Sequence, residues 1–377
     1  MIQLAWKFIR FDRAKSIGII TAIVISIFLI GQQVGLLLFL MGLMGNLVGN
    51  ANVNEQDIWI IESQTLNANT LNKIDQRYVQ QLRSIPGISN AYGVVVASGE
   101  ARFLDGNTAG VQIIGSDAPI FKAGPNLSKI YQGTIEDLTR PESISAEFFN
   151  AKSWNTDLYI NKPVEINGKS ATIKVITKQA QAFGGNYMYT SLVNARHYGN
   201  VASYHVSLIS ATVSPDANKE TVIQMINQQY PQLKAWDVKK LQQSTVKEIL
   251  ISSNMGMSFG TLVVFAMISG FFIIGLTLYS SALDRIKEYG TLKAIGANKK
   301  YVNRLLITQA FLYALIGFGI AFLLLLGFAQ GVKNSGLEID FSLGFISFLL
   351  GITLFISIGG SLFAVRKISK LEPASVF

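Results

Sequence analysis

Four long segments of the chain contain no charged residue. They are residues 16–54, 249–283, 305–332 and 341–365. A helix rises 1.5 Å per residue, so about 20 apolar residues cross a hydrocarbon layer ~30 Å thick. Buried helices of soluble proteins rarely run this far without a charge. The pattern predicts four transmembrane helices, at residues 17–45, 256–283, 305–331 and 341–365.

The first apolar run follows a basic leader, as a signal peptide does. It is about twice as long as the 7–15 apolar residues typical of such a peptide. We therefore interpret it as a retained membrane anchor. Ahead of it, Ile2, Ala5, Trp6 and Ile9 recur at helical spacing among basic residues. This predicts an interfacial helix over residues 1–16, lying on the inner leaflet.

Residues 46–255 have the pattern of a folded α/β domain. Asp105-Gly106 and Asn167-Gly168 are tight-turn signals between short apolar segments. The expected strands are 57–61, 91–97, 101–104, 111–115, 158–160, 163–166, 171–177, 204–213 and 233–238, with helices at 71–84 and 218–228. Strand–helix–strand units at both ends predict one α/β domain, with a β-rich subdomain inserted at roughly residues 125–200.

No proline occurs from Lys239 to Ala282. We therefore expect one continuous helix that runs from the large domain into the membrane. Such a helix would couple movements of the domain to movements of the membrane helices. The alternative is a stalk without mobility.

The basic residues are concentrated in three short segments. Residues 1–15, 284–304 and 366–377 together hold thirteen basic and four acidic residues, a surplus equal to the net charge of +9. Four crossings place all three segments on one side, which the positive-inside rule makes cytoplasmic. Both termini are therefore expected inside, with residues 46–255 and a short outer loop at 332–340 outside. The same distribution argues against nucleic-acid binding.

Composition removes several classes of catalytic site. The chain has no cysteine, which excludes disulfides and thiolate chemistry, and its two histidines, His197 and His205, lack metal-site spacing. The predicted spans hold no Asp, Glu, Lys, Arg or His, and Gln32-Gln33 is their most polar feature. The acidic residues Glu136, Asp137 and Glu142 are close in the sequence, but the sequence does not establish that they are close in space. We predict no catalytic residue, no metal ligand and no catalysis on this chain.

The segment from Leu283 to Ala297 joins the second and third predicted membrane helices. Its sequence, LDRIKEYGTLKAIGA, spaces Leu283, Ile286 and Tyr289 three residues apart and places glycines at 290 and 296. This predicts a short amphipathic helix parallel to the membrane, with an apolar ridge and charged flanks. The stretch resembles the R-x-K-E-x-G-x-L-K-A-I-G-A signature of FtsX-like, MacB-type ABC transporter permeases. The tail residues around Ala364–Lys367 and Leu371–Ala374 also resemble that family, and the nearest type is the DevC-like branch, which works with a membrane-fusion protein.

The resemblance implies the same layout, with one membrane helix, a large extracytoplasmic domain and three further helices. It also implies that residues 284–304 dock into a separate ATPase as a coupling helix. By position this role falls on Arg285, Ile286, Glu288, Gly290, Leu292, Lys293 and Gly296. No G-x-x-x-x-G-K-[ST] phosphate loop occurs in the sequence, so we expect no cofactor on this chain, with ATP and Mg²⁺ bound by the partner.

Two functions remain open at this point. The first is a permease subunit in a bacterial inner membrane, which couples ATP hydrolysis to movement of its outer domain and to export or extraction of an amphiphilic substrate. The second is an FtsX-like regulator, which transmits the state of the ATPase to an outside hydrolase or sensor without transport. Expected partners are an ABC ATPase subunit, a second permease copy, a membrane-fusion protein and the lipid bilayer, with no nucleic acid.

Overall fold

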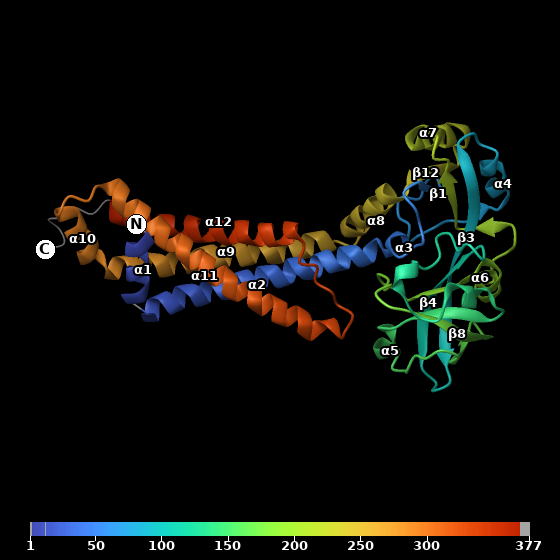
Figure 1. The fold of residues 1–377 in the computed structure, drawn as a ribbon, viewed down its shortest axis with the longest axis horizontal. Coiled ribbons are helices and arrows are strands. Elements are labelled where there is room, and N and C mark those ends of the chain that lie inside the picture. Colours follow the sequence, from blue (N-terminus) through green and yellow to red (C-terminus); the bar gives the residue numbers. More distant parts are fainter. Residues whose placement is uncertain (1, 12, 370–377) are drawn as a thin grey trace. The chain divides into compact units, whose positions relative to one another are not determined.

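A computed structural model describes residues 2–11 and 13–369, apart from the side chains of residues 293, 294, 364 and 367–369. The chain divides into two compact units (Figure 1). The membrane unit comprises Met1–Phe39 and Gly256–Phe377, and the sheet unit comprises Leu40–Met255.

The membrane unit consists of helices. They are α1 (Ile2–Phe11), α2 (Arg13–Met44, whose last turn belongs to the sheet unit), α9 (Met255–Asp284), α10 (Ile286–Ala294), α11 (Lys299–Lys333) and α12 (Leu343–Ser369). Among the described residues, four helices are long and apolar enough to span a membrane: Arg13–Met44, Met255–Asp284, Lys299–Lys333 and Leu343–Phe363. The predicted four-helix membrane architecture is therefore confirmed.

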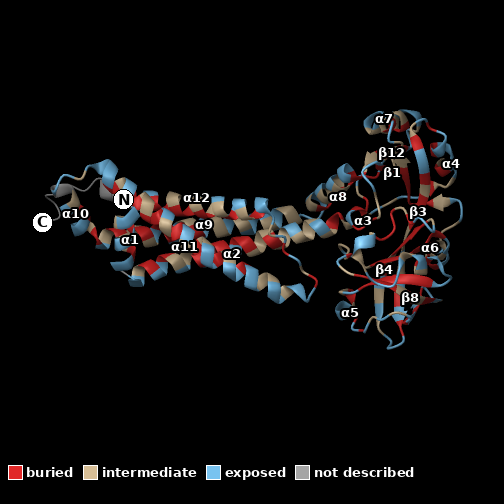
Figure 2. Ribbon diagram, in the orientation of Figure 1, coloured by how far each residue is buried: buried red, intermediate tan, exposed pale blue. Residues whose placement is uncertain are grey.

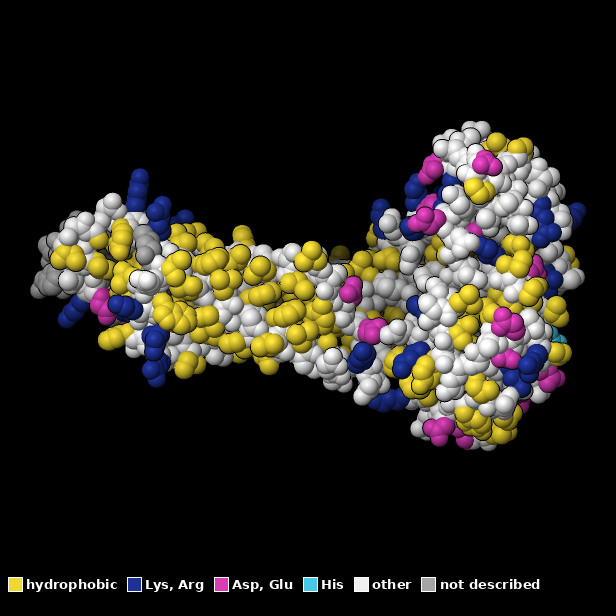
Figure 3. Space-filling view, viewed as in Figure 1, with side chains coloured by type: hydrophobic (Ala, Val, Ile, Leu, Met, Phe, Trp, Pro, Cys, Tyr) yellow, Lys and Arg dark blue, Asp and Glu magenta, His cyan; other side chains and the backbone are white. Residues whose placement is uncertain are grey.

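The interior of the membrane unit is a shared apolar core. Ile23 of α2, Ile274 of α9, Tyr313 of α11 and Leu349 of α12 all belong to it. Buried residues of the four long helices line this core, while the outer faces of these helices remain exposed (Figure 2). Hydrophobic side chains dominate those outer faces (Figure 3). A surface of this kind suits a lipid environment, because lipid tails are as apolar as the side chains.

The sheet unit is built around a ten-stranded mixed sheet. Its strands are β1 (Asp57–Glu62), β3 (Ile88–Phe103), β4 (Thr108–Ser116), β5 (Ile130–Gln132), β6 (Ser143–Glu147), β7 (Pro163–Ile166), β8 (Lys169–Thr177), β9 (Tyr187–Ser191), β11 (Leu208–Val213) and β12 (Leu233–Asp237). A separate ribbon pairs β2 (Ile74–Asp75) with β10 (His205–Val206). The helices are α3 (Asn46–Gly49), α4 (Arg77–Arg83), α5 (Asn150–Ser153), α6 (Leu192–Gly199), α7 (Lys219–Gln229) and α8 (Val238–Ser252), with two 3₁₀ turns at Leu127–Lys129 and Ile135–Thr139.

One long strand, β3, holds the sheet together. Its first half pairs with β11, its last residues pair with β7, and β4 runs antiparallel to it from Val94 to Arg102. The main path of the sheet is β12-β1-β11-β3-β7-β8-β5. The strands of the expected inserted subdomain thus continue the sheet of the flanking segments, and the sheet unit is one compact body.

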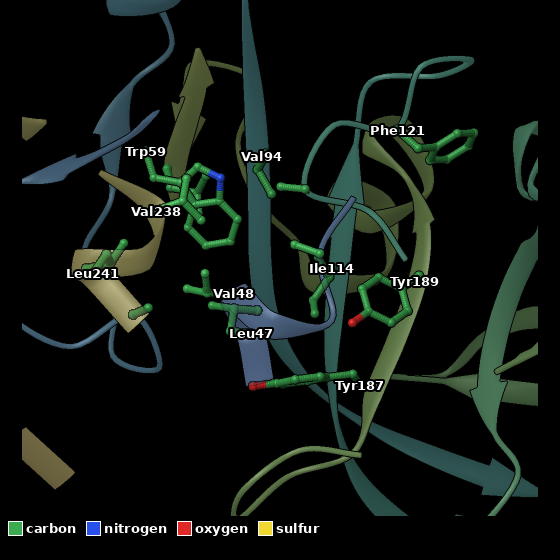
Figure 4. Close-up of a cluster of buried hydrophobic side chains, with 14 of the residues drawn as sticks. Leu47, Val48, Trp59, Val94, Ile114, Phe121, Tyr187, Tyr189, Val238 and Leu241 are labelled. Atoms are coloured by element: carbon green, nitrogen blue, oxygen red, sulfur yellow. The ribbon is translucent and has the colours of Figure 1, made fainter. Parts of the chain in front are cut away.

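Side chains of β1 alternate between two cores, as the pleat of a strand requires. Ile58 and Ile60 face the core beneath α4 and α7. Trp59 and Ile61 face a second core on the opposite side of the sheet. Figure 4 shows how Leu47 and Val48 of α3 meet Val238 and Leu241 of α8 in this second core. A third core lies among β4, β6, β8 and α6 and contains Phe103, Trp154 and Tyr198.

Several local predictions for the sheet unit are confirmed. Asp105-Gly106 closes the β3–β4 hairpin, and Gly106 has a positive φ of 84°. Asn167-Gly168 closes the β7–β8 hairpin with φ values of 49° and 76°. Both residues of this loop therefore lie in the left-handed region, as a type I′ turn demands.

Three expected boundaries are wrong. The separate strands 91–97 and 101–104 form the single strand β3, whose polar middle is partly exposed and not a turn. The expected helix over 71–84 begins only at Arg77, because Ile74 and Asp75 pair with β10. Residues 158–160 form no strand.

The expected continuous helix from Lys239 to Ala282 is also wrong. α8 ends at Ser252 and α9 begins at Met255. Asn254 adopts a left-handed φ of 54°, which few residues other than glycine and asparagine tolerate. The Ser253 hydroxyl donates to the carbonyl of Ile249, so the side chain competes with the helical hydrogen bonds. Three consecutive small polar residues, Ser252 to Asn254, thus interrupt the helix without a proline.

Candidate functional site: the segment from Asp284 to Arg304

The predicted coupling segment forms the short helix α10 between two turns. Arg285 forms a turn that separates α9 from α10. After α10, Gly296 has a φ of 103°, a conformation that glycine adopts at helix ends without strain. Asn298 then caps α11, its side-chain oxygen accepting from the Tyr301 amide at 2.8 Å. Glycine and asparagine thus set both the end of α10 and the start of α11.

The inward face of α10 packs against its own chain. Tyr289 is only 1% exposed, and Gly290 is buried beside it. Tyr289 lies in an apolar cluster drawn from α1, α9, α10, α11 and α12, with Ala5, Ala282, Val302, Leu305, Leu306 and Val365. Burial raises the pKa of the Tyr289 hydroxyl to about 12. The apolar side chains of the segment therefore largely pack α10 against the helix bundle.

Arg285 joins α10 to α1. Its side chain is 7% exposed, and its Nη1 donates to the Phe8 carbonyl at 2.9 Å. The guanidinium also lies 5.3 Å from the centre of the Phe8 ring, within range of a cation–π contact. Arg285, expected to orient a partner protein, thus has an intrachain role. Phe8 lies on α1, and no local signal in the sequence distinguishes it as the residue that contacts Arg285.

The outward face of α10 is exposed. Lys287, Glu288 and Thr291 are exposed, and Ile295, which follows the helix, is 76% exposed. Glu288, Thr291 and Ile295 are separated by three and four residues, so they share one side of the segment. Among the other predicted coupling residues, Ile286 and Leu292 are half-buried and Gly296 is exposed. The Lys293 side chain lies outside the described residues.

The tail motif falls mostly outside what the structure describes. Val365 belongs to the apolar cluster around Tyr289, and Arg366 is exposed. Leu371–Ala374 lie outside the described residues. An ion pair of 2.6 Å between Lys15 and Asp284 further ties α2 to the end of α9.

The acidic residues singled out in the sheet unit have structural roles. Asp137 accepts from the amide and hydroxyl of Thr134 and pairs with Arg140 at 3.0 Å. The Thr134 amide is the main reason that the pKa of Asp137 is lowered. Glu142 occupies a left-handed turn with a φ of 54°. Within the described ranges, no three metal-ligating side chains come together.

A buried carboxylate that the sequence did not indicate is Glu147, at the end of β6. It accepts from the Thr177 hydroxyl at 2.7 Å and from the amides of Gln179 and Ala180. Burial raises the pKa of Glu147, outweighing these hydrogen bonds. Thr177 is the last residue of β8 and Gln179 and Ala180 follow it, so Glu147 holds the chain where that strand ends.

The chain is similar to known permeases in two ways. Residues 260–373 match the family described as FtsX-like permease C-terminal. Among solved structures, the periplasmic region of MacB from Actinobacillus actinomycetemcomitans is 11% identical, with a TM-score of 0.38, over 52% of this chain and 94% of that one. The extracellular domain of the noncanonic ABC-type transporter YknZ from Gram-positive bacteria is 14% identical, with a TM-score of 0.35, over 48% and 99%.

A domain of a putative permease from Porphyromonas gingivalis is 10% identical, with a TM-score of 0.33, over 48% of this chain and 88% of that one. No curated protein matches the chain. The family match covers α10 and nearly all of the last three membrane helices, the part of the chain that carries the signature around Glu288 and Gly290. Residues 260–373 of this chain therefore form an FtsX-like permease domain.

Proposed function

We propose that this permease couples ATP hydrolysis on a separate ABC ATPase to export or extraction of an amphiphilic substrate. The observation that carries the proposal is the division of α10 into two faces. Tyr289 fixes the inward face to the bundle, while Glu288, Thr291 and Ile295 remain exposed on the other side. A helix anchored in this way transmits a push from a docked protein to the membrane helices, because its own packing leaves little room for independent movement.

The outward face has the composition of a small protein-docking surface. Ile295 supplies an apolar side chain that is 76% exposed, and Glu288 and Lys287 supply charges of both signs on the same segment. Apolar anchors with a polar rim are typical of protein interfaces. The proposed coupling surface is therefore Lys287, Glu288, Thr291 and Ile295, and Arg285 acts by holding α10 against α1.

The proposed orientation follows from charge. The basic surplus at residues 1–15, 284–304 and 366–377 puts α10 on the cytoplasmic side, where ATP is available, and the sheet unit outside. Four helices are few to enclose a pathway, so we propose a pair of permeases as the working unit. A membrane-fusion protein on the outer side completes the proposed assembly.

The test is purification of the tagged full-length protein in mild detergent, with mass spectrometry of the proteins that accompany it. We expect an ATPase with a phosphate-binding loop, together with a membrane-fusion protein. An accompanying cell-wall hydrolase in place of the fusion protein would indicate regulation without transport. Absence of any ATPase from an intact, dimeric preparation would contradict the proposal.

A matched pair of substitutions tests the coupling surface itself. Ile295→Asp places a charge at the proposed anchor, and Val193→Asp does the same at a side chain of the sheet unit that is 75% exposed. We expect Ile295→Asp to lose the ATPase and Val193→Asp to retain it, with both variants eluting as the wild type does. Retention of the ATPase by both variants would remove α10 from the interface.

A further inference from the structure

A groove lies between α1 and α10 at the basic end of the membrane unit. It has a volume of about 220 Å³ and is lined by Leu4, Lys7, Phe8, Phe11, Arg285 and Glu288. All six residues belong to the same compact unit. Lys and Arg side chains are visible around this end of the unit in Figure 3. We propose that the groove binds the headgroup of an anionic phospholipid.

The charge of the groove suits a phosphodiester. Lys7 and Arg285 contribute two positive charges and Glu288 one negative charge, which leaves one net positive charge. The phosphodiester of a phospholipid such as phosphatidylglycerol carries one negative charge, whereas phosphatidylcholine is neutral overall. Basic pockets beside membrane helices are a recognised form of anionic-lipid site, because the low local dielectric strengthens the attraction.

The shape and the surroundings suit a lipid better than a soluble anion. The volume equals that of about seven water molecules, enough for a phosphate and a glycerol. Leu4, Phe8 and Phe11 form an apolar wall, and Phe11 is 83% exposed. The exposed face of α1 also carries Ile2 and Trp6. A helix with basic and large apolar side chains on its exposed face is typical of the membrane interface, where acyl chains cover the apolar groups.

Arg285 makes the groove a structural part of the bundle. Its guanidinium is held by the Phe8 carbonyl and ring, so its charge is fixed in place at the floor between α1 and α10. Lys7 is exposed and also lines the groove. A bound phosphate would therefore bridge Lys7 of α1 and Arg285, the residue before α10.

Trp6 offers a direct readout of this lipid. It lies next to Lys7 on α1, while the other tryptophans, Trp59, Trp154 and Trp236, lie in the sheet unit. The full-length protein is reconstituted in mixed phosphatidylglycerol and phosphatidylcholine vesicles, with bromine on the acyl chains of one lipid or the other. Bromine quenches a tryptophan it contacts, and subtraction of the signal of Trp6→Phe isolates Trp6. We expect brominated phosphatidylglycerol to quench Trp6 more strongly than its share of the mixture predicts.

Two substitutions distinguish a site from general surface charge. Lys7→Gln should lower the preference for phosphatidylglycerol about fivefold, the effect of one basic residue at an anionic surface. Lys300→Gln removes the same charge from an exposed position that does not line the groove, and should leave the preference unchanged. Phe11→Ser, at a side chain too exposed to affect folding, should weaken quenching by both lipids.

Three results would overturn the proposal. Equal quenching by the two lipids would show that no anionic lipid is selected. Equal losses in Lys7→Gln and Lys300→Gln would indicate diffuse attraction to the whole basic surface. Loss of the preference when the partner ATPase is added would assign the groove to a protein.

Discussion

The rings of Phe8 and Tyr289 lie stacked, with centres 5.9 Å apart and planes 18° apart. Phe8 belongs to α1 and Tyr289 to α10, so two short helices almost 300 residues apart in sequence share one aromatic contact. Arg285 covers the Phe8 ring at 5.3 Å and completes the contact. The position of α10 on the bundle thus depends on a helix at the beginning of the chain.

Replacing Tyr289 by alanine should therefore loosen α10. The change removes a fully buried aromatic ring and leaves a cavity, which costs about 3 kcal/mol of folding free energy. Thermal unfolding in detergent, followed by circular dichroism, would measure it. Tyr301→Ala, at a partly exposed tyrosine at the start of α11, is the control and should change stability by less than about 0.5 kcal/mol. Equal effects of the two changes would contradict the anchoring role of Tyr289.

In the sheet unit, Gly115 is where β4 meets α6. A Cβ atom on Gly115 would lie 2.1 Å from the Ala195 Cβ, and neither atom can rotate away. We expect Gly115→Ala to destabilise the sheet unit by roughly 1–3 kcal/mol through overpacking. Gly110, on the same strand, has open space around it, so Gly110→Ala should be neutral or slightly stabilising. Urea unfolding followed by tryptophan fluorescence compares them.

A second glycine pair tests packing inside the membrane unit. A Cβ on Gly317 of α11 would lie 2.4 Å from Cγ2 and 2.8 Å from Cβ of Ile23 on α2. Gly319 has open space. Gly317→Ala should push α2 and α11 apart and lower the melting temperature in detergent, whereas Gly319→Ala should leave it unchanged. A lower melting temperature for Gly319→Ala alone would show that the two helices meet along another face.

Asp237 makes the stability of the sheet unit depend on pH in the acidic range. Its Oδ1 caps α8 by accepting from the Lys240 amide at 3.0 Å, and its Oδ2 pairs with Lys219 at 2.5 Å. Burial tends to raise the pKa of Asp237, but the bonds from Lys219 and the helix amides outweigh it and lower the pKa. Because the folded pKa lies below the unfolded value, the stabilisation is complete above that value, about 3.9, and is lost as pH falls through the folded pKa.

Asp237→Asn keeps a capping oxygen and removes the charge. We expect it to lower the free energy of unfolding at pH 7 by about 1 kcal/mol, and the difference from the wild type to shrink below about pH 4. Urea unfolding at several pH values, followed by the fluorescence of the neighbouring Trp236, measures this. Asp157→Asn, at an exposed aspartate, is the charge-matched control. A difference that stayed constant with pH would exclude the ion pair as its cause.

The sequence predicted the features that depend on neighbouring residues and not those that depend on contacts between distant residues. The four spans follow from the absence of charge over more than 20 residues, and the turns at Asp105-Gly106 and Asn167-Gly168 follow from backbone conformations that few residues adopt. Neither requires knowledge of distant contacts, and both are confirmed.

Features set by contacts between distant residues were not accessible from the pattern. Arg285 looks like a surface charge in its own segment, but it is buried and contacts Phe8, a residue far away in the sequence. Residues 91–97 and 101–104 were expected to form two strands, but β4 pairs with the residues between them and keeps β3 continuous. The small polar residues at Ser253 and Asn254 were a local signal for the break between α8 and α9. The absence of proline nevertheless favoured a continuous helix in the prediction.

The shared strand β3 has a consequence for dissecting the sheet unit. Its first half lines the cores around Trp59 and Ile58, and its second half lines the core around Trp154. Excising residues 125–200 would remove β5 to β9, so that the end of β3 would lose its partner β7 and β4 would lose its partner β9. Unpaired strand edges of this kind promote aggregation. Trp59 and Trp154 should therefore report a single cooperative transition, and the smallest fragment that folds on its own should contain both halves of β3.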